Sequence, residues 1–134
     1  MTHTAPTPTI ERWHAIARSR SAAGLSDLIA EDAIFESPVV HTPQRGRAIT
    51  VKYLTAALHV LGNDSFKYLG QWQASNSAVL EFEAVCEGIT INGVDMIEWN
   101  AAGQITHFKV MVRPLKALNK LHELMGRMLQ SASG

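Results

Sequence analysis

Apolar and polar side chains alternate along most of the second half of this chain. Alternation with a period of two is typical of strands that bury one face. The strands predicted in this way are 65–72, 80–87, 93–99 and 104–113. Turns are predicted at 75–77 and 100–103, and a third lies between Glu87 and Gly93, where both Gly88 and Asn92-Gly93 are tight-turn signals.

The first half of the chain has the periodicity of helices instead. Ile10, Trp13 and Ile16 share one stripe of a helix that begins at Pro8, and a short helix follows Gly24. A short strand at 33–37 and a loop at 39–46 come next. The helix predicted at 47–61 is apolar on more than one face, so it is covered on both sides or lines a cavity. A last helix begins at Pro114.

Helices that precede a run of strands predict an α+β domain. We expect one domain over residues 8–130, with flexible tails at 1–7 and 131–134. The composition, with 46% apolar and 18% charged residues, is that of a globular protein.

Charge and motifs exclude several classes of function. Twelve basic residues balance twelve acidic ones and form no run, which argues against nucleic-acid binding. No apolar run is long enough to span a membrane, no signal peptide is visible, and the single Cys86 suits a reducing cytoplasm. We therefore expect a cytoplasmic protein. Neither a phosphate-binding glycine loop nor a paired His motif occurs, so neither a cofactor nor a metal is expected.

Asp95 is the first candidate for chemistry. It occupies the strand face that otherwise carries Ile97 and Trp99. A carboxylate among large apolar side chains is costly unless it has a partner or a role. Two interpretations remain open: a pocket acid whose pKa is raised by burial, or a structural carboxylate bonded to a backbone N–H or to Trp13.

The order of elements over residues 9–115 resembles the nuclear transport factor 2-like superfamily, in particular its SnoaL-like members. The segments AEDAIFESPVV and VMVRPL are also similar to bacterial members of that group. The resemblance implies a cystatin-like cone, in which a curved mixed or antiparallel sheet wraps against helices around an apolar pocket. It also implies a homodimer formed through the outer sheet face. Members include isomerases, cyclases, hydrolases, dehydratases and non-catalytic binding proteins, so the fold alone does not fix the activity.

A narrower similarity is to the ketosteroid isomerases of this superfamily. Val94-Asp95 before the turn 100–103 matches the aspartate that holds an enolate oxygen there. Trp13 stands where that family has a tyrosine, and Ser37 stands where it has the catalytic base. A tryptophan can only donate a hydrogen bond, and an unassisted serine is a poor base. In the epoxide hydrolases and cyclases, a carboxylate on the last strand faces the pocket, and Val110 falls near that position.

These observations predict binding of a small, mostly apolar molecule with one polar group. Asp95 would hold the polar group, and Ser37 and His41 would lie near the entrance. The predicted walls are Trp13, Tyr53, Trp72, Trp99, Phe108 and Val110. The alternative is a cofactor-independent isomerase, cyclase or hydrolase in which Asp95 is the acid or base. A third possibility is an interaction module that uses the mixed charges of the outer sheet face, where His107 is predicted to lie near glutamates.

Overall fold

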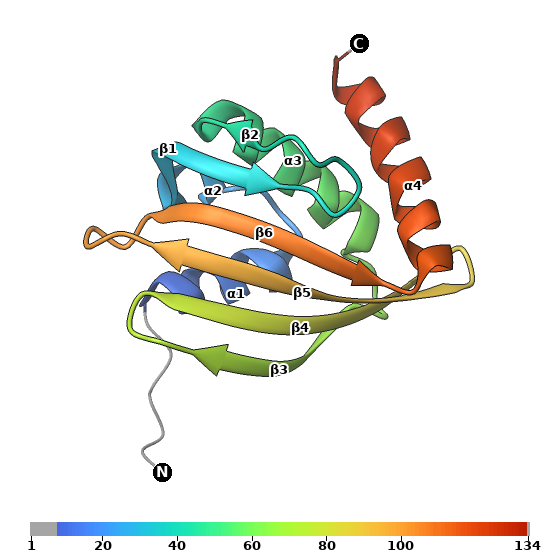
Figure 1. Cartoon of the computed structure of the whole chain (residues 1–134), viewed down its shortest axis with the longest axis horizontal. Coiled ribbons are helices and arrows are strands. Elements are labelled where there is room, and N and C mark those ends of the chain that lie inside the picture. The colour runs from blue at the N-terminus through green and yellow to red at the C-terminus, as the bar shows by residue number, and fades with distance from the viewer. Residues whose placement is uncertain (1–7, 134) are drawn as a thin grey trace.

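A six-stranded mixed sheet forms the body of the protein (Figure 1). The computed structural model describes residues 8–133. The strands are β1 (Ile29–Glu36), β2 (Gln44–Arg45), β3 (Lys67–Gln73), β4 (Ser77–Cys86), β5 (Ile89–Trp99) and β6 (Ile105–Arg113). They lie in the order β2-β1-β6-β5-β4-β3. Strands β3 to β6 are a continuous antiparallel meander, as predicted, whereas β1 pairs with β6 in parallel.

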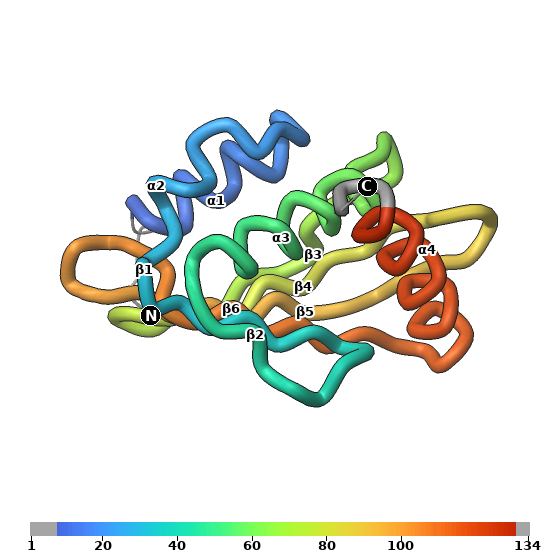
Figure 2. The backbone as a smooth tube through the Cα atoms, turned by 90° about the horizontal axis from the view of Figure 1, so that it is seen from above, coloured from blue at the N-terminus to red at the C-terminus, as the bar shows by residue number. Residues whose placement is uncertain are grey.

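The helices of the described residues lie on one side of this sheet (Figure 2), and α4 (Leu115–Ser133), which follows the last strand, packs on the same inward face at the end near the β4–β5 hairpin. The other three helices are α1 (Pro8–Ser19), α2 (Leu25–Leu28) and α3 (Arg47–Leu61). Helix α1 begins at Pro8 and α3 has both of its bounds as predicted. Helix α3 contacts β1, β4 and both neighbouring helices α2 and α4, which explains why it is apolar on more than one face.

The tight turn between β4 and β5 lies at Glu87-Gly88, one of the two glycine positions at which the sequence predicted it. Glu87 and Gly88 both have positive φ, at 51° and 79°, as a two-residue type I′ turn requires. Cys86 pairs with Ile89 on either side of it. Gly93 instead lies inside β5, opposite Phe82. This register places Asp95 opposite Leu80 on β4 and Val110 on β6, facing the helices.

Several boundaries differ from the sequence predictions. Strands β4 and β5 begin at Ser77 and Ile89, three and four residues before the predicted strands at 80–87 and 93–99. Strand β1 begins four residues earlier than the predicted strand at 33–37, and the predicted loop 39–46 contains the short strand β2. Helix α4 continues to Ser133, past the predicted domain end at residue 130. The predicted tail at residues 1–7 lies outside the described residues.

Two apolar clusters fill the space between the sheet and the helices. One gathers around α1, α2 and β1, and the other around α4 and the β4–β5 hairpin. Three partly buried residues, Tyr53, Tyr68 and Val110, pack against both clusters. The candidate site lies at this junction.

Candidate functional site

Asp95 is buried in the middle of β5, with 7% of its surface exposed. The hydroxyl of Tyr68 on β3 donates a hydrogen bond to its Oδ2, at 2.8 Å. Among residues 8–133, this hydroxyl is the one hydrogen-bond partner of the Asp95 side chain. The carboxyl group therefore has bonding capacity left on the side that faces the interior.

A second donor completes a short polar chain. The indole Nε1 of Trp13 on α1 donates to the Tyr68 oxygen at 2.8 Å, so the order of donation is Trp13 to Tyr68 to Asp95. The Trp13 ring also packs edge-on against Phe108, with centroids 4.9 Å apart. The chain fixes the direction of the Tyr68 hydroxyl, because its oxygen accepts from Trp13 and its proton points at Asp95.

Burial dominates the electrostatics of this chain. Burial raises the pKa of Asp95 from 3.8 to about 7, although the hydrogen bond from Tyr68 lowers it in part. The pKa of Tyr68 is raised well above its usual value by burial and by the adjacent Asp95 charge. The carboxyl group thus exchanges its proton near neutral pH, whereas Tyr68 stays a neutral donor.

Asp95 and Tyr68 lie in the wall of a cavity between the sheet and the helices. The cavity leaves about 60 Å³ for the centre of a water-sized sphere, well above the ~10–15 Å³ that one water molecule needs. Its lining is otherwise mostly apolar and comes from every layer of the fold: Trp13, Ala17, Phe35, Ser37, Pro38, Val39, Leu54, Ala57, Leu58, Leu61, Gly62, Phe66, Phe82, Phe108, Val110, Leu121 and Met125. Of these described residues, Asp95 supplies the one carboxyl group. A cavity of this size favours a small or slender ligand.

The structure brings five of the nine predicted site residues together. Asp95, Trp13, Ser37, Phe108 and Val110 all line the cavity. The Ser37 hydroxyl accepts a hydrogen bond from the Val39 N–H, so it stabilises the turn after β1. No residue that lines the cavity is positioned to take the proton of the Ser37 hydroxyl. Ser37 therefore lacks the partner that it would need to act as a base.

The other four predicted residues lie elsewhere. His41 is exposed in the loop after β1. Tyr53 packs against Phe35, with ring centroids 5.3 Å apart, but it does not line the cavity. Trp99 is buried at the far end of β5, beside the turn that begins at Asn100.

Trp72 is placed on the opposite face of the sheet from the one predicted. The register between β3 and β4 shifts by one residue between Tyr68 and Gly70, which is a β-bulge. One extra residue turns every later side chain to the other face, so Trp72 pairs with Val79 on the outer face and is 60% exposed. Its ring folds over Gly70, where an added Cβ would lie only 3.0 Å from it.

Tyr68 is the functional candidate that sequence reasoning missed. The alternation of 65–72 placed it on the inward face, but nothing in the sequence showed that its hydroxyl would meet Asp95 two strands away. The register that brings them together depends on the Glu87–Gly88 turn and on the bulge in β3. The available signal was that both Tyr68 and Asp95 were predicted on inward strand faces, where a tyrosine hydroxyl can pair with a carboxylate that has no other partner.

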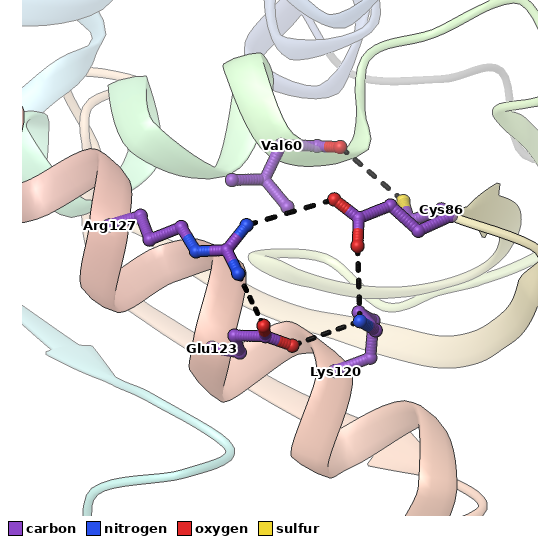
Figure 3. A network of polar contacts seen from close by, with 6 residues as sticks. Val60, Cys86, Lys120, Glu123 and Arg127 are labelled. Carbon is purple, nitrogen blue, oxygen red and sulfur yellow. Dashed lines mark hydrogen bonds and ion pairs between the residues drawn. The ribbon is translucent and has the colours of Figure 1, made fainter.

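Helix α4 covers one end of the cavity and is tied to the sheet by a ring of charges (Figure 3). Lys120 contacts Glu87 in the β4–β5 turn at 3.1 Å and Glu123 on its own helix at 2.9 Å. Arg127 closes the ring through Glu123 at 2.5 Å and Glu87 at 3.9 Å. Beside it, the buried Cys86 thiol donates to the Val60 carbonyl, and burial raises the pKa of this thiol, so it is a poor nucleophile.

Within residues 8–133, no three or more His, Cys, Asp or Glu side chains are arranged so that they could hold a metal ion. Over the same range, no helix is both long and apolar enough to cross a membrane.

Comparison with known proteins assigns the family. The family model of the SnoaL-like domain matches residues 10–108, and the chain belongs to this family. The crystal structure of a steroid delta-isomerase from Pseudomonas aeruginosa is 38% identical, with a TM-score of 0.88 over 92% of this chain and 90% of the other. No curated protein matches the sequence.

Two further solved structures support the predicted fold. A protein of cystatin-like fold from Silicibacter pomeroyi is 28% identical, with a TM-score of 0.83 over 90% of this chain and 84% of the other. A nuclear transport factor 2-like protein of unknown function from Mesorhizobium loti is 20% identical, with a TM-score of 0.69 over 79% and 88%. The last similarity concerns the fold alone. The predicted α+β cone and the predicted superfamily are confirmed.

Proposed function

We propose that this protein binds a small, mostly apolar molecule in the cavity and holds one polar group of it at Asp95. The observation that carries the proposal is the Asp95 carboxyl group itself. It lines an apolar cavity, and Tyr68 is its one hydrogen-bond partner within residues 8–133. A buried carboxyl group that is only partly satisfied favours a ligand atom that completes its hydrogen bonding.

The protonation of Asp95 sets which polar group is preferred. Below about pH 7 the protonated carboxyl donates a hydrogen bond, and above it the carboxylate only accepts. A ketone oxygen, which only accepts, is therefore bound best by the protonated form. Affinity for a ketone is expected to fall as the pH rises through 7.

Calorimetric titration with octan-2-one, a slender ketone, tests this proposal. Wild-type protein is expected to bind it more tightly at low than at high pH, and Asp95→Asn, whose amide donates at every pH, is expected to lose that dependence. Ala57→Leu fills the cavity and is expected to abolish binding. Ala15→Leu, on the exposed face of α1, is the matched control. Undiminished binding by folded Ala57→Leu would overturn the proposal.

A second candidate function is proton transfer on a bound ketone, and the pKa of Asp95 favours it. A carboxylate with a pKa of about 7 is a stronger base than an ordinary one, and it returns the proton readily. The similarity to a protein described as a steroid delta-isomerase supports the same chemistry. On a ketone with a C=C bond one carbon further along, Asp95 would take a proton from the carbon between the two groups. The C–H electrons would form a dienolate, and the proton would return at the far end of the double bond, which moves next to the carbonyl.

Exchange of ketone protons for deuterium tests this chemistry without the natural substrate. Octan-2-one in deuterated buffer is followed by proton NMR with wild-type or Asp95→Asn protein. The wild type is expected to accelerate exchange at the carbons beside the carbonyl, with a rate that rises through pH 7 as Asp95 ionises. Equal rates for the two proteins would remove the catalytic candidate and leave the binding proposal standing.

We also propose that two copies associate through the outer sheet face. An apolar patch lies there among charges, formed by Trp72, Met96 and Met111, which are 60%, 38% and 51% exposed, together with Val79. Trp72, Val79 and Met96 lie side by side across β3, β4 and β5. Sedimentation of wild type and Met96→Glu tests the proposal, and a dimer is expected only for the wild type. A wild-type monomer at high protein concentration would contradict it.

A further inference from the structure

We propose that the ligand of the cavity is an amphipathic anion, whose apolar part occupies the cavity and whose acidic group is held by Arg18 and Lys67. This inference rests on the proposed binding function and adds the chemical class of the ligand. The observation behind it is a second, basic hollow that adjoins the cavity.

The second hollow lies where the ends of α1 and α3 meet the start of β3. By the same measure as for the cavity, the hollow leaves about 210 Å³ for the centre of a water-sized sphere. Four of its lining residues, Ala17, Gly62, Phe66 and Tyr68, also line the cavity, so the two spaces share a wall. Tyr68 thus faces both spaces and carries the hydrogen bond to Asp95.

The remaining lining of the hollow is polar and positively charged. Arg18, Arg20 and Lys67 are three of the twelve Lys and Arg residues of a chain whose net charge is zero, and all three line this hollow. His14 and Asn63 complete the lining, and it includes no acidic side chain among the described residues. The basic charge is therefore local and is not an effect of overall composition.

Two of these cations have no partner within residues 8–133. Neither Arg18 nor Lys67 makes an ion pair or a side-chain hydrogen bond there, whereas Arg20 pairs with Asp64 at 3.0 Å. Asp64 is fully exposed, so that pair is weak. Exposed ion pairs elsewhere form a closed ring around Glu87 and Glu123. Arg18 and Lys67 therefore lie beside the apolar cavity with no partner among the described residues.

Guanidinium and ammonium groups next to an apolar space fit a molecule with an apolar body and a carboxylate or phosphate group. The apolar body gains from burial in the cavity, while the acidic group remains in the more polar hollow and avoids the cost of full desolvation. A neutral molecule with the same body would gain only the first of these contributions.

Calorimetric titrations with octanoate and with octan-1-ol, which share an unbranched eight-carbon skeleton, test the inference. At about pH 8 octanoate is fully ionised. We expect octanoate to bind about tenfold more tightly than octan-1-ol, since two exposed charge contacts together contribute on the order of 1.4 kcal/mol. This advantage is expected to shrink at high salt.

The variant Arg18→Gln/Lys67→Gln is expected to bind both probes equally. The matched control, Arg12→Gln/Lys116→Gln, also removes one Arg and one Lys, and both of its residues are exposed and line neither space. The control is expected to keep the octanoate advantage. Octyl phosphate serves as a third probe, and a larger advantage for it than for octanoate would identify phosphate as the acidic group.

Each outcome separates the inference from the proposed function. Equal binding of octanoate and octan-1-ol by wild-type protein overturns the inference and leaves apolar binding intact. An octanoate advantage that survives in Arg18→Gln/Lys67→Gln also overturns it. If none of the three probes binds to wild-type protein, both the inference and the proposed function fall.

Discussion

Two carboxyl groups on opposite faces of the same sheet have pKa values shifted in opposite directions. Asp95 on the inner face has its pKa raised to about 7 by burial. Glu36 on the outer face has its pKa lowered, chiefly by its hydrogen bond with His107, whose Nε2 lies 2.5 Å from Glu36 Oε2. Glu98 approaches the other ring nitrogen of His107 at 3.3 Å.

The difference shows what makes an acidic residue a candidate for function in this fold. Glu36 has a hydrogen-bond partner in His107 and is partly exposed to water, so its charge is stabilised and needs nothing further. Asp95 has one neutral donor and little water, so its ionised form is disfavoured and a ligand can complete its bonding. Location relative to the cavity, rather than residue type, distinguishes the two.

The largest expected effect comes from Asp95→Asn. Because folding raises the pKa of Asp95, the folded state binds this proton more tightly than the unfolded state does. Stability from this group is therefore full below pH 3.8 and is lost as the pH rises towards about 7. Across that window the wild type is expected to lose about 3 kcal/mol relative to Asp95→Asn.

Urea unfolding of both proteins at several pH values measures this loss. The comparison between variants cancels the other carboxyl groups, which titrate in both proteins. Parallel stability curves for the two proteins would show that Asp95 has an ordinary pKa, and the contrast with Glu36 would disappear.

Gly93→Ala tests how tightly the inner face is packed. A Cβ at Gly93 would lie 2.5 Å from the Met111 carbonyl oxygen and 2.6 Å from the Phe82 ring. A loss of about 2 kcal/mol in unfolding free energy is expected from this overpacking. Gly126→Ala, in α4, meets no atom within 4 Å and is expected to stabilise the protein by about 0.5–1 kcal/mol. Equal effects of both substitutions would contradict the packing described here.

Two buried threonines provide the next comparison. Within residues 8–133, the Thr50 hydroxyl in α3 has no hydrogen-bond partner, whereas the Thr9 hydroxyl donates to the Gly103 carbonyl at 2.8 Å. Thr50→Val is expected to stabilise the protein by about 1 kcal/mol, and Thr9→Val to destabilise it by about as much. Thermal unfolding measures both. A stability loss for Thr50→Val would mean that its hydroxyl has a partner.

The smallest expected effect belongs to the outer face. Since folding lowers the pKa of Glu36, its contribution is present above pH 4.5 and is lost as the pH falls below that value. His107→Gln removes the main cause, so the variant is expected to lose less stability than the wild type on acidification. The pH range over which Glu36 affects stability lies below the range over which Asp95 does. Unfolding curves between about pH 3 and 5 therefore separate the two contributions. Equal losses would show that His107 does not stabilise the Glu36 carboxylate.

Most of the fold was predictable from periodicity. The alternation on β4, β5 and β6 assigned the inward faces correctly, because a buried face leaves a period of two in the sequence. The helix at 47–61 was predicted with its observed bounds, and its breadth of apolar residues indicated that it is covered on both sides or lines a cavity. The parallel pairing of β1 with β6 was not predictable, since it joins segments about 70 residues apart without a local signal.

The candidate site was predictable only where it depended on residue type and strand face. Asp95, Phe108 and Val110 satisfy that condition and line the cavity. The position of Trp72 could not be predicted in this way. A one-residue bulge in β3 turns its side chain to the outer face, and the bulge has no clear signal in the sequence. The Trp13–Tyr68–Asp95 chain joins three separate elements, so it required the tertiary structure.

The property that most distinguishes this site is that the buried Asp95 carboxyl group in the cavity wall exchanges its proton near neutral pH. Carbon-13 NMR of the side-chain carboxyl groups across pH, with Asp95→Asn used to assign the resonance, tests it most directly. We expect one aspartate resonance with a midpoint near 7 that is missing from the variant. If every aspartate titrates below about pH 5, as ordinary carboxyl groups do, the claim is wrong.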